Sequence, residues 1–174
     1  LMVSRSSDFP VSTSPLNNGY LSADSVQSLA AAVRYTAGAL VLGVHASNVT
    51  YRPGSGSLFT DTARFDTAGL IASYQLSQAV FIGAGYSYTR ERAANGITDP
   101  ANYQQVSLEQ TYSFSKRTAV YFLEAFQNAR GRTLGAAGAG NPVNAVALVG
   151  DSQNGSPSSG RNQTVLMVGL RHSF

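Results

Sequence analysis

The chain ends on the stretch Asn162-Gln-Thr-Val-Leu-Met-Val-Gly-Leu-Arg-His-Ser-Phe174, and this stretch decides the fold. Every second side chain belongs to a largely apolar set: Thr164, Leu166, Val168, Leu170, His172 and Phe174. The side chains between them form a second set: Val165, Met167, Gly169, Arg171 and Ser173. Successive side chains leave a β-strand on opposite sides, so the alternation predicts a strand with two different faces. The ends of soluble domains are usually polar and frayed, so the terminal Phe174 indicates an apolar environment outside the strand.

The ending Gly169-Leu-Arg-His-Ser-Phe174 resembles the C-terminal strand of Gram-negative outer-membrane porins, in particular the general porins of β-proteobacteria. That family often has an aromatic residue or His two positions before the end, and His172 matches it. The resemblance implies that the barrel-assembly machinery reads an assembly signal made of Leu166, Val168, Leu170 and Phe174. The alternative is an edge strand of a soluble β-domain.

The composition combines low charge with the absence of a helical membrane span. Of the 174 residues, 12% are charged, about half the usual share, while 43% are hydrophobic. No run of about 18 consecutive apolar residues is present, as a transmembrane helix would require. Strands with one face toward lipid and the other toward water would give this neutral average. The absence of Cys fits an exported chain without disulfides, and the scattered Arg residues give no nucleic-acid signature.

Six further stretches alternate in the same manner: 27–36, 39–51, 62–75, 79–90, 102–114 and 118–129. Short links near residues 37, 77 and 116 alternate with long, Gly-rich or Pro-containing links. Long strands joined by alternating tight turns and longer loops are typical of transmembrane β-barrels. Residues 1–26 read as a loop with a strand remnant at 1–5, and 143–149 as an extension of the flanking strands. We therefore expect one unit over 1–174, an all-β antiparallel transmembrane barrel segment with seven or eight strands.

The facing of stretch 118–129 is ambiguous. Its more apolar side, with Val120, Phe122 and Phe126, also carries Glu124. A carboxylate that faces lipid is expensive. We therefore expect this side to face inward, with the other side outside: Tyr121, Leu123 and Ala125.

The polar faces carry few charges, and these are the candidate pore-lining residues: Arg34, His45, Glu109, Glu124 and Arg171. Charged side chains around a pore influence which ions enter it. Glycines on the same faces, among them Gly43, Gly69 and Gly83, are expected to leave room for a channel. With two His and no Cys, a closed zinc site is not expected. We expect no catalytic residues, no metal and no cofactor.

The resemblance implies an outer-membrane porin, in which a water-filled channel lets small hydrophilic solutes and ions diffuse passively. It covers residues from about 20 onward and corresponds to the C-terminal half of a sixteen-stranded barrel, expected to form a homotrimer in outer-membrane lipid. No signal peptide or inward-folded constriction loop is recognisable, so we expect the chain to be part of a longer protein. Two alternatives stay open: a small closed barrel with a structural or adhesive role, and an outer-membrane enzyme.

Overall fold

Long antiparallel strands dominate the computed structural model, which describes residues 2–6, 18–135, 140–149 and 156–174. Within these residues, eight strands form one sheet in the order β1-β2-β3-β4-β5-β6-β7-β10. Their bounds are β1 Met2–Ser6, β2 Ser25–Ala37, β3 Leu40–Arg52, β4 Ala63–Gln75, β5 Val80–Glu91, β6 Asn102–Ser113, β7 Thr118–Arg130 and β10 Asn162–His172. Every neighbouring pair is antiparallel. All seven predicted strands are present, and β1 adds the strand predicted as a remnant.

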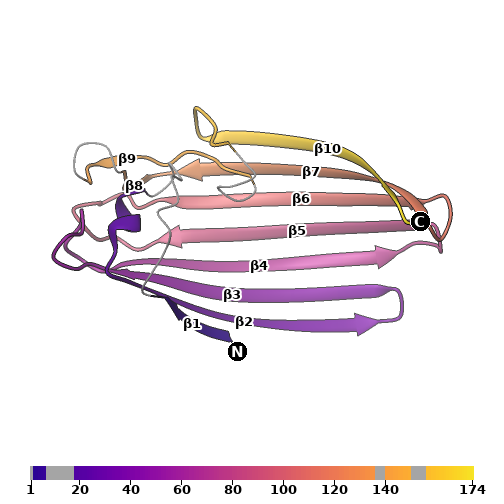
Figure 1. Ribbon diagram of the computed structural model, residues 1–174, viewed down its shortest axis with the longest axis horizontal. Helices are drawn as coiled ribbons and strands as arrows, with labels where there is room; N and C mark the ends of the chain where they lie inside the picture. The colour runs from indigo at the N-terminus through magenta and orange to yellow at the C-terminus, as the bar shows by residue number, and fades with distance from the viewer. Residues whose placement is uncertain (1, 7–17, 136–139, 150–155) are drawn as a thin grey trace.

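The links confirm the predicted alternation of short and long connections. Three short links join β2 to β3, β4 to β5 and β6 to β7, and they lie together at one end of the sheet, called here the turn end (Figure 1). Gly38 adopts a φ of 58° in the first of them, a left-handed conformation that glycine adopts without steric cost. The long links lie together at the opposite end, called here the loop end.

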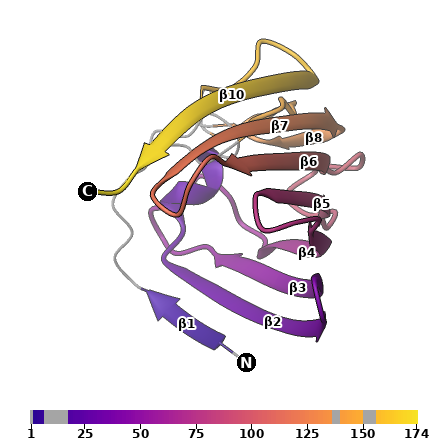
Figure 2. The same ribbon diagram turned by 90° about the vertical axis from the view of Figure 1, so that its right-hand side faces the viewer.

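The sheet curves strongly, so that its two faces differ in shape. Figure 2 shows the strands from β1 to β10 along an arc, with the short 3₁₀ helix η1 (Asn18–Ser22) inside it. The inner face is called the concave face and the outer one the convex face. Because side chains alternate with a period of two, one register assigns every residue to a face, and a slip of one residue would exchange the faces.

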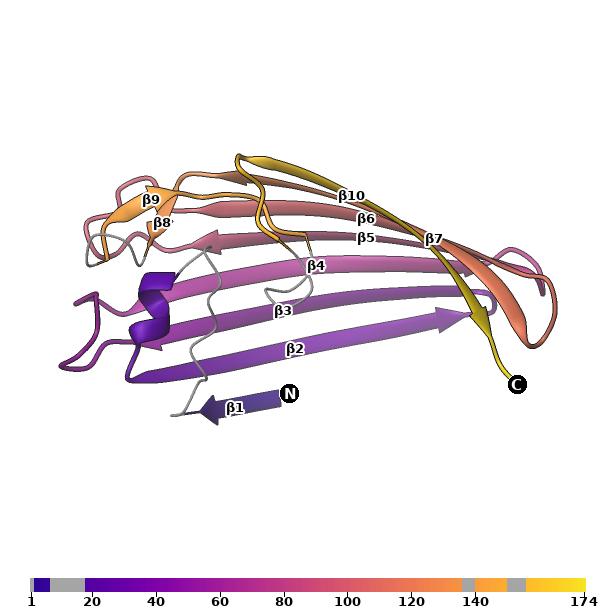
Figure 3. The ribbon, with the colours of Figure 1, turned by 45° about the horizontal axis from the view of Figure 1, so that its top comes forward.

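A small core closes the concave face at the loop end. Tyr20 of η1 is fully buried against Phe59, Phe65, Ile97 and Leu134. The hairpin of β8 (Arg132–Leu134) and β9 (Pro142–Asn144) lies beside η1 in Figure 3. This set of packed residues is called the loop core.

The prediction that 143–149 extends the flanking strands is wrong. The segment after β9 folds back over the concave face, where the backbone N–H of Leu148 donates to Gln127 of β7 (2.7 Å) and that of Val149 donates to Gln163 of β10 (2.6 Å). Its small residues Ala145 and Ala147 are buried there. Buried backbone N–H groups require hydrogen-bond acceptors. The side chains of Gln127 and Gln163 provide them for this segment.

The sheet has two open edges within the described residues. β10 pairs with β7 alone, and β1 covers only the 26–30 part of β2. β1 and β10 are not paired with each other, so these strands do not form the small closed barrel that was one alternative. No helix among the described residues is both long and apolar enough to cross a membrane.

Candidate functional site

The convex face carries a continuous apolar band. Among the strand residues, the large apolar side chains with high exposure lie on this face, with Ile71 and Met167 as the exceptions. The band consists of Leu29, Val33, Tyr35, Leu42, Val44, Leu70, Tyr74, Ile82, Tyr86, Val106, Leu108, Tyr112, Phe126, Leu166, Val168 and Leu170. An exposed apolar surface of this extent marks contact with a partner or a membrane.

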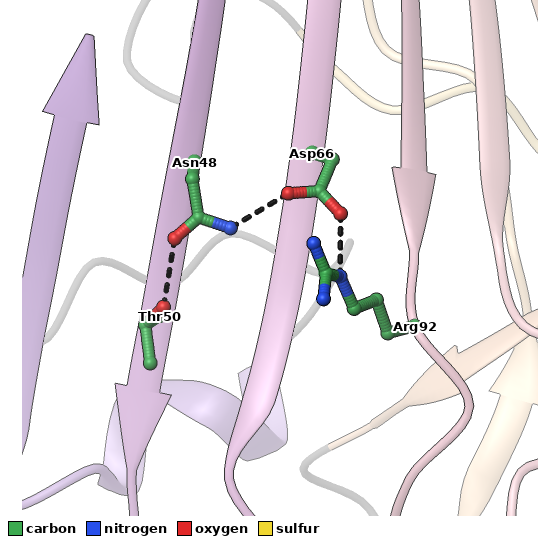
Figure 4. A network of polar contacts seen from close by, with 4 residues as sticks. All are labelled: Asn48, Thr50, Asp66 and Arg92. Atoms are coloured by element: carbon green, nitrogen blue, oxygen red, sulfur yellow. Dashed lines mark hydrogen bonds and ion pairs between the residues drawn. The ribbon is translucent and has the colours of Figure 1, made fainter.

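A polar rim ends this band toward the loop end. In Figure 4, Arg92 forms an ion pair with Asp66 (2.6 Å), and Asn48 donates to the same carboxylate (2.7 Å). Thr50 in turn donates to Asn48 (2.9 Å). The Asp66 carboxylate raises the pKa of the exposed Arg92 above its usual value. Asn128, which donates to Asn162 (2.6 Å), continues the rim on β7 and β10.

Glu124 lies on the convex face, so its interpretation as a pore-lining residue is wrong. The register puts it directly opposite Leu108 of β6 and Leu166 of β10, both in the apolar band. The residues expected outside, Tyr121, Leu123 and Ala125, lie on the concave face instead. The register of β7 with both neighbouring strands fixes which of its side chains lie on each face. The opposite facing would place Val120, Phe122 and Phe126 on the concave face.

The other four candidates lie on the concave face but do not form one cluster. Arg34 is on β2, His45 on β3, Glu109 on β6 and Arg171 on β10, and no hydrogen bond or ion pair joins them in the described part of the chain. Arg171 borders a hollow of about 520 Å³ at the turn end, together with Lys116 and Arg117. That these charges line water remains a prediction.

The His and acidic side chains of the described residues do not gather into a metal-binding cluster. Those residues contain no group of three or more His, Cys, Asp or Glu side chains that could hold a metal ion. His45 and His172 lie on opposite faces, and His172 contacts Thr118 (2.9 Å) rather than an acid.

Neighbouring side chains cover several glycines that were expected to leave the channel open. The His45 ring lies over Gly69, the Tyr121 ring over Gly169, and Ile71 over Gly43, each so closely that an added Cβ would overlap the neighbour. These glycines therefore seat large side chains flat against the sheet. Gly83 differs, because an added Cβ would meet nothing closer than Phe81 at 3.5 Å.

The concave face also holds a cluster of apolar side chains, among them Leu123, which was expected on the outer side. Ile71, Phe81, Leu123, Val165 and Met167 border a hollow of about 480 Å³ in the middle of the sheet. Ile71 and Met167 are about half exposed there, at 52% and 49%. The sequence shows apolar residues on both faces of some strands. That these residues lie together could be known only from the order of the strands in the sheet.

The loop core contains a buried polar pair at the mouth of the concave face. The Tyr20 hydroxyl donates to Glu91 at 2.5 Å, and both side chains are fully buried. The second Glu91 oxygen, Oε2, has no hydrogen-bond partner among the described residues. Burial, strengthened by this hydrogen bond, raises the pKa of the Tyr20 phenol well above its usual value. The pair therefore holds η1 against the end of β5.

The proposed assembly-signal residues lie along the open edge. Leu166, Val168 and Leu170 project from the convex face of β10 with 64–69% exposure, and Phe174 is fully exposed. The Phe174 ring packs edge-on against His172 with ring centroids 4.8 Å apart. Their role in assembly remains a prediction.

Comparison with known proteins identifies the architecture. No protein-family model matches the sequence, and no curated protein matches it significantly. Among solved structures, the chain is similar to the outer-membrane expressed OmpT of Vibrio cholerae, with a TM-score of 0.58 and 18% sequence identity. The match covers 85% of this chain and 42% of that chain, so this chain spans less than half of the matched protein. The fold is thus an antiparallel sheet that matches part of an outer-membrane porin barrel.

Proposed function

We propose, from this porin-like fold, that the sheet forms part of the wall of an outer-membrane channel for passive diffusion of small hydrophilic solutes and ions. The convex face would contact lipid and the concave face water. The observation that carries the proposal is the division of the strands into an apolar convex band, bounded by a polar rim, and a concave face with Arg34, His45, Glu109 and Arg171.

The height of the band supports contact with a membrane. On β5 the convex side chains run from Val80 to Tyr88 before Arg90 joins the rim. This distance is about 26 Å at about 3.3 Å per residue. Apolar bands of outer-membrane barrels are about 25 Å tall. A soluble sheet would cover such a band with a second apolar layer, and the described residues provide none on this side.

The open edges require further strands. An unsatisfied backbone group in hydrocarbon costs several kcal/mol. We infer that strands from the remainder of a longer protein, or from another copy, pair with β10 and with the free part of β2. The resemblance to general porins of β-proteobacteria favours a sixteen-stranded barrel and a homotrimer. Phe174 at the end of β10 would then act as the signal for the barrel-assembly machinery.

Cysteine accessibility during conductance tests the proposal. The chain contains no Cys, so single substitutions can be labelled without background. Ser107 and Leu108 are adjacent in sequence and lie on opposite faces. In the protein reconstituted in a planar bilayer, a charged thiol reagent should reduce the current through Ser107→Cys and leave Leu108→Cys unchanged. Equal effects on the two variants, or no ion conductance in the unmodified protein, would contradict the channel.

A further inference from the structure

The apolar hollow on the concave face is unusual for the wall of a water-filled channel. Ile71, Phe81, Leu123, Val165 and Met167 come from four strands, β4, β5, β7 and β10, and surround about 480 Å³. Hollows that bind small molecules commonly measure about 300–1,000 Å³ and are lined mainly by apolar side chains. Side chains that only line a water-filled channel have no need to be apolar.

Glycine gives the hollow its depth. Gly83 lies on its floor, and its nearest neighbours for an added Cβ are Phe81 at 3.5 Å and the Cβ of Glu109 at 3.7 Å. The space above Gly83 could therefore admit one more small group, unlike that above Gly69 or Gly169, which neighbouring rings fill. A flat group could lie against the backbone of β5 here, in contact with the Phe81 ring.

Two acidic residues border the hollow, but the register places the Glu124 side chain on the convex face, so that Glu109 is the acidic residue on the concave face. Glu109 lines it, and the hydroxyl of Thr111 donates to its Oε1 at 3.2 Å. No Lys or Arg pairs with Glu109 in the described part of the chain, whose ion pair is that between Arg92 and Asp66. The charge is thus available to a cation from solution. Charge-assisted hydrogen bonds to a carboxylate are roughly twice as strong as neutral ones.

We propose that this hollow binds small organic ammonium ions with a flat apolar body, the body above Gly83 and the ammonium group at Glu109. The apolar walls favour removal of a hydrocarbon body from water, and the carboxylate selects the sign of its charge. The inference rests on the proposed channel only for the route by which such solutes arrive. The channel would then slow and select these cations among the solutes that it passes.

Methionine NMR provides a direct test. The chain has two Met residues, Met167 at the hollow and Met2 in β1 at the opposite edge of the sheet. The full protein would be labelled with ¹³C-methyl methionine and studied in detergent micelles. Phenethylammonium should shift the Met167 methyl signal saturably, because the ring of the bound ligand would lie beside that methyl group. The Met2 signal should stay in place and report any non-specific partitioning into the micelle. Phenylpropionate, of similar shape and opposite charge, should give no saturable shift.

Two variants separate the two parts of the site. Glu109→Gln should weaken phenethylammonium binding about tenfold, since it removes one charge-assisted contact. Gly83→Leu should abolish the Met167 shift by filling the space above the floor. Ala32→Leu, also an apolar substitution on the concave face but on β2, is the matched control and should bind normally.

The proposal is overturned if Met167 gives no saturable shift, which would also follow if another polypeptide segment already covers the hollow. It is equally overturned if phenylpropionate binds as well as phenethylammonium, or if Gly83→Leu leaves binding unchanged. Conductance measured on the same preparation reports on the channel separately. A Met167 shift without conductance would reject the proposed channel and support the binding site. Conductance without a shift would support the channel and reject the binding site.

Discussion

Glu124 allows the assignment of faces to be tested by a charge pair. It lies mid-strand in the apolar convex band, directly opposite Leu108 on β6. Leu70 occupies the same band on β4, but its cross-strand neighbours are Val44 and Tyr86, which carry no formal charge. Leu108→Arg would therefore place a cation beside a carboxylate, whereas Leu70→Arg would place one among apolar side chains.

The two substitutions should differ in their cost to the free energy of unfolding. An Arg on the lipid face near the bilayer midplane costs about 2–4 kcal/mol, and we expect this full range for Leu70→Arg. Opposite charges directly across two strands contribute about 0.2–1 kcal/mol in sheets. The low dielectric of hydrocarbon strengthens that attraction, so Leu108→Arg should cost about 1 kcal/mol less than Leu70→Arg.

A double-mutant cycle with Glu124→Leu isolates the pair. The protein, folded into lipid vesicles, would be unfolded in urea, with circular dichroism and heat-modifiable migration as two independent probes. In the Glu124→Leu background, Leu108→Arg should regain its full cost, which gives a coupling energy of about 1 kcal/mol. Leu70→Arg should cost the same in both backgrounds, because Glu124 is not its neighbour. Ser107→Arg on the concave face should change stability by less than about 1 kcal/mol.

Two results would refute the reasoning. Equal costs for Leu70→Arg and Leu108→Arg, with no coupling to Glu124, would mean that Glu124 does not share the face of Leu108. A Ser107→Arg cost as large as that of Leu70→Arg would mean that both faces are equally dry, and that the concave face does not line water.

The two ends of the sheet allow four further tests. Asn95→Cys at the loop end should be labelled from outside intact cells and Ser77→Cys at the turn end should not; the opposite labelling would invert the topology. Tyr20→Phe, which leaves the buried Glu91 without its phenol donor, should weaken the loop core by about 1–3 kcal/mol, and unchanged hydrogen exchange in the loops would contradict this. Because the folded phenol has a raised pKa, its stabilisation should be complete below about pH 10 and decline at higher pH; Tyr20→Phe should reduce that alkaline loss, measured by the same exchange. Deletion of Phe174 should lower the amount of protein inserted in the outer membrane far more than a distant Ala substitution in the apolar band, and equal amounts on semi-native gels would reject its role as an assembly signal.

The sequence predicted the strands well because the signal is local. Each strand alternates over ten or more residues, and turn residues such as Gly38 mark where the chain reverses. The observed bounds of β5, Val80–Glu91, differ from the expected 79–90 by one residue at each end. The concave placement of Arg34, His45, Glu109 and Arg171 was likewise predictable, since each alternates with apolar neighbours on its own strand.

The sequence could not decide the facing of β7. The number of apolar residues favoured the side with Glu124 as the lipid-facing one, and the cost of a charge in lipid favoured the other side. Both considerations involve only residues of this strand. The register with β6 and β10 settled it, because Glu124 must face the same way as Leu108 and Leu166 once these three residues are paired. A penalty of a few kcal/mol for one carboxylate is smaller than the cost of turning a whole apolar strand face inward.

By itself, then, the sequence determined which segments are strands, where they reverse and which of their faces is apolar, because all of these depend on neighbours two residues away along the chain. Tertiary structure alone decided what lies side by side. The loop core joins Tyr20 to Glu91, 71 residues apart in the sequence. The apolar hollow gathers Ile71, Phe81 and Met167 from separate strands. Such contacts depend on strand order and register, which alternation within a single strand does not specify.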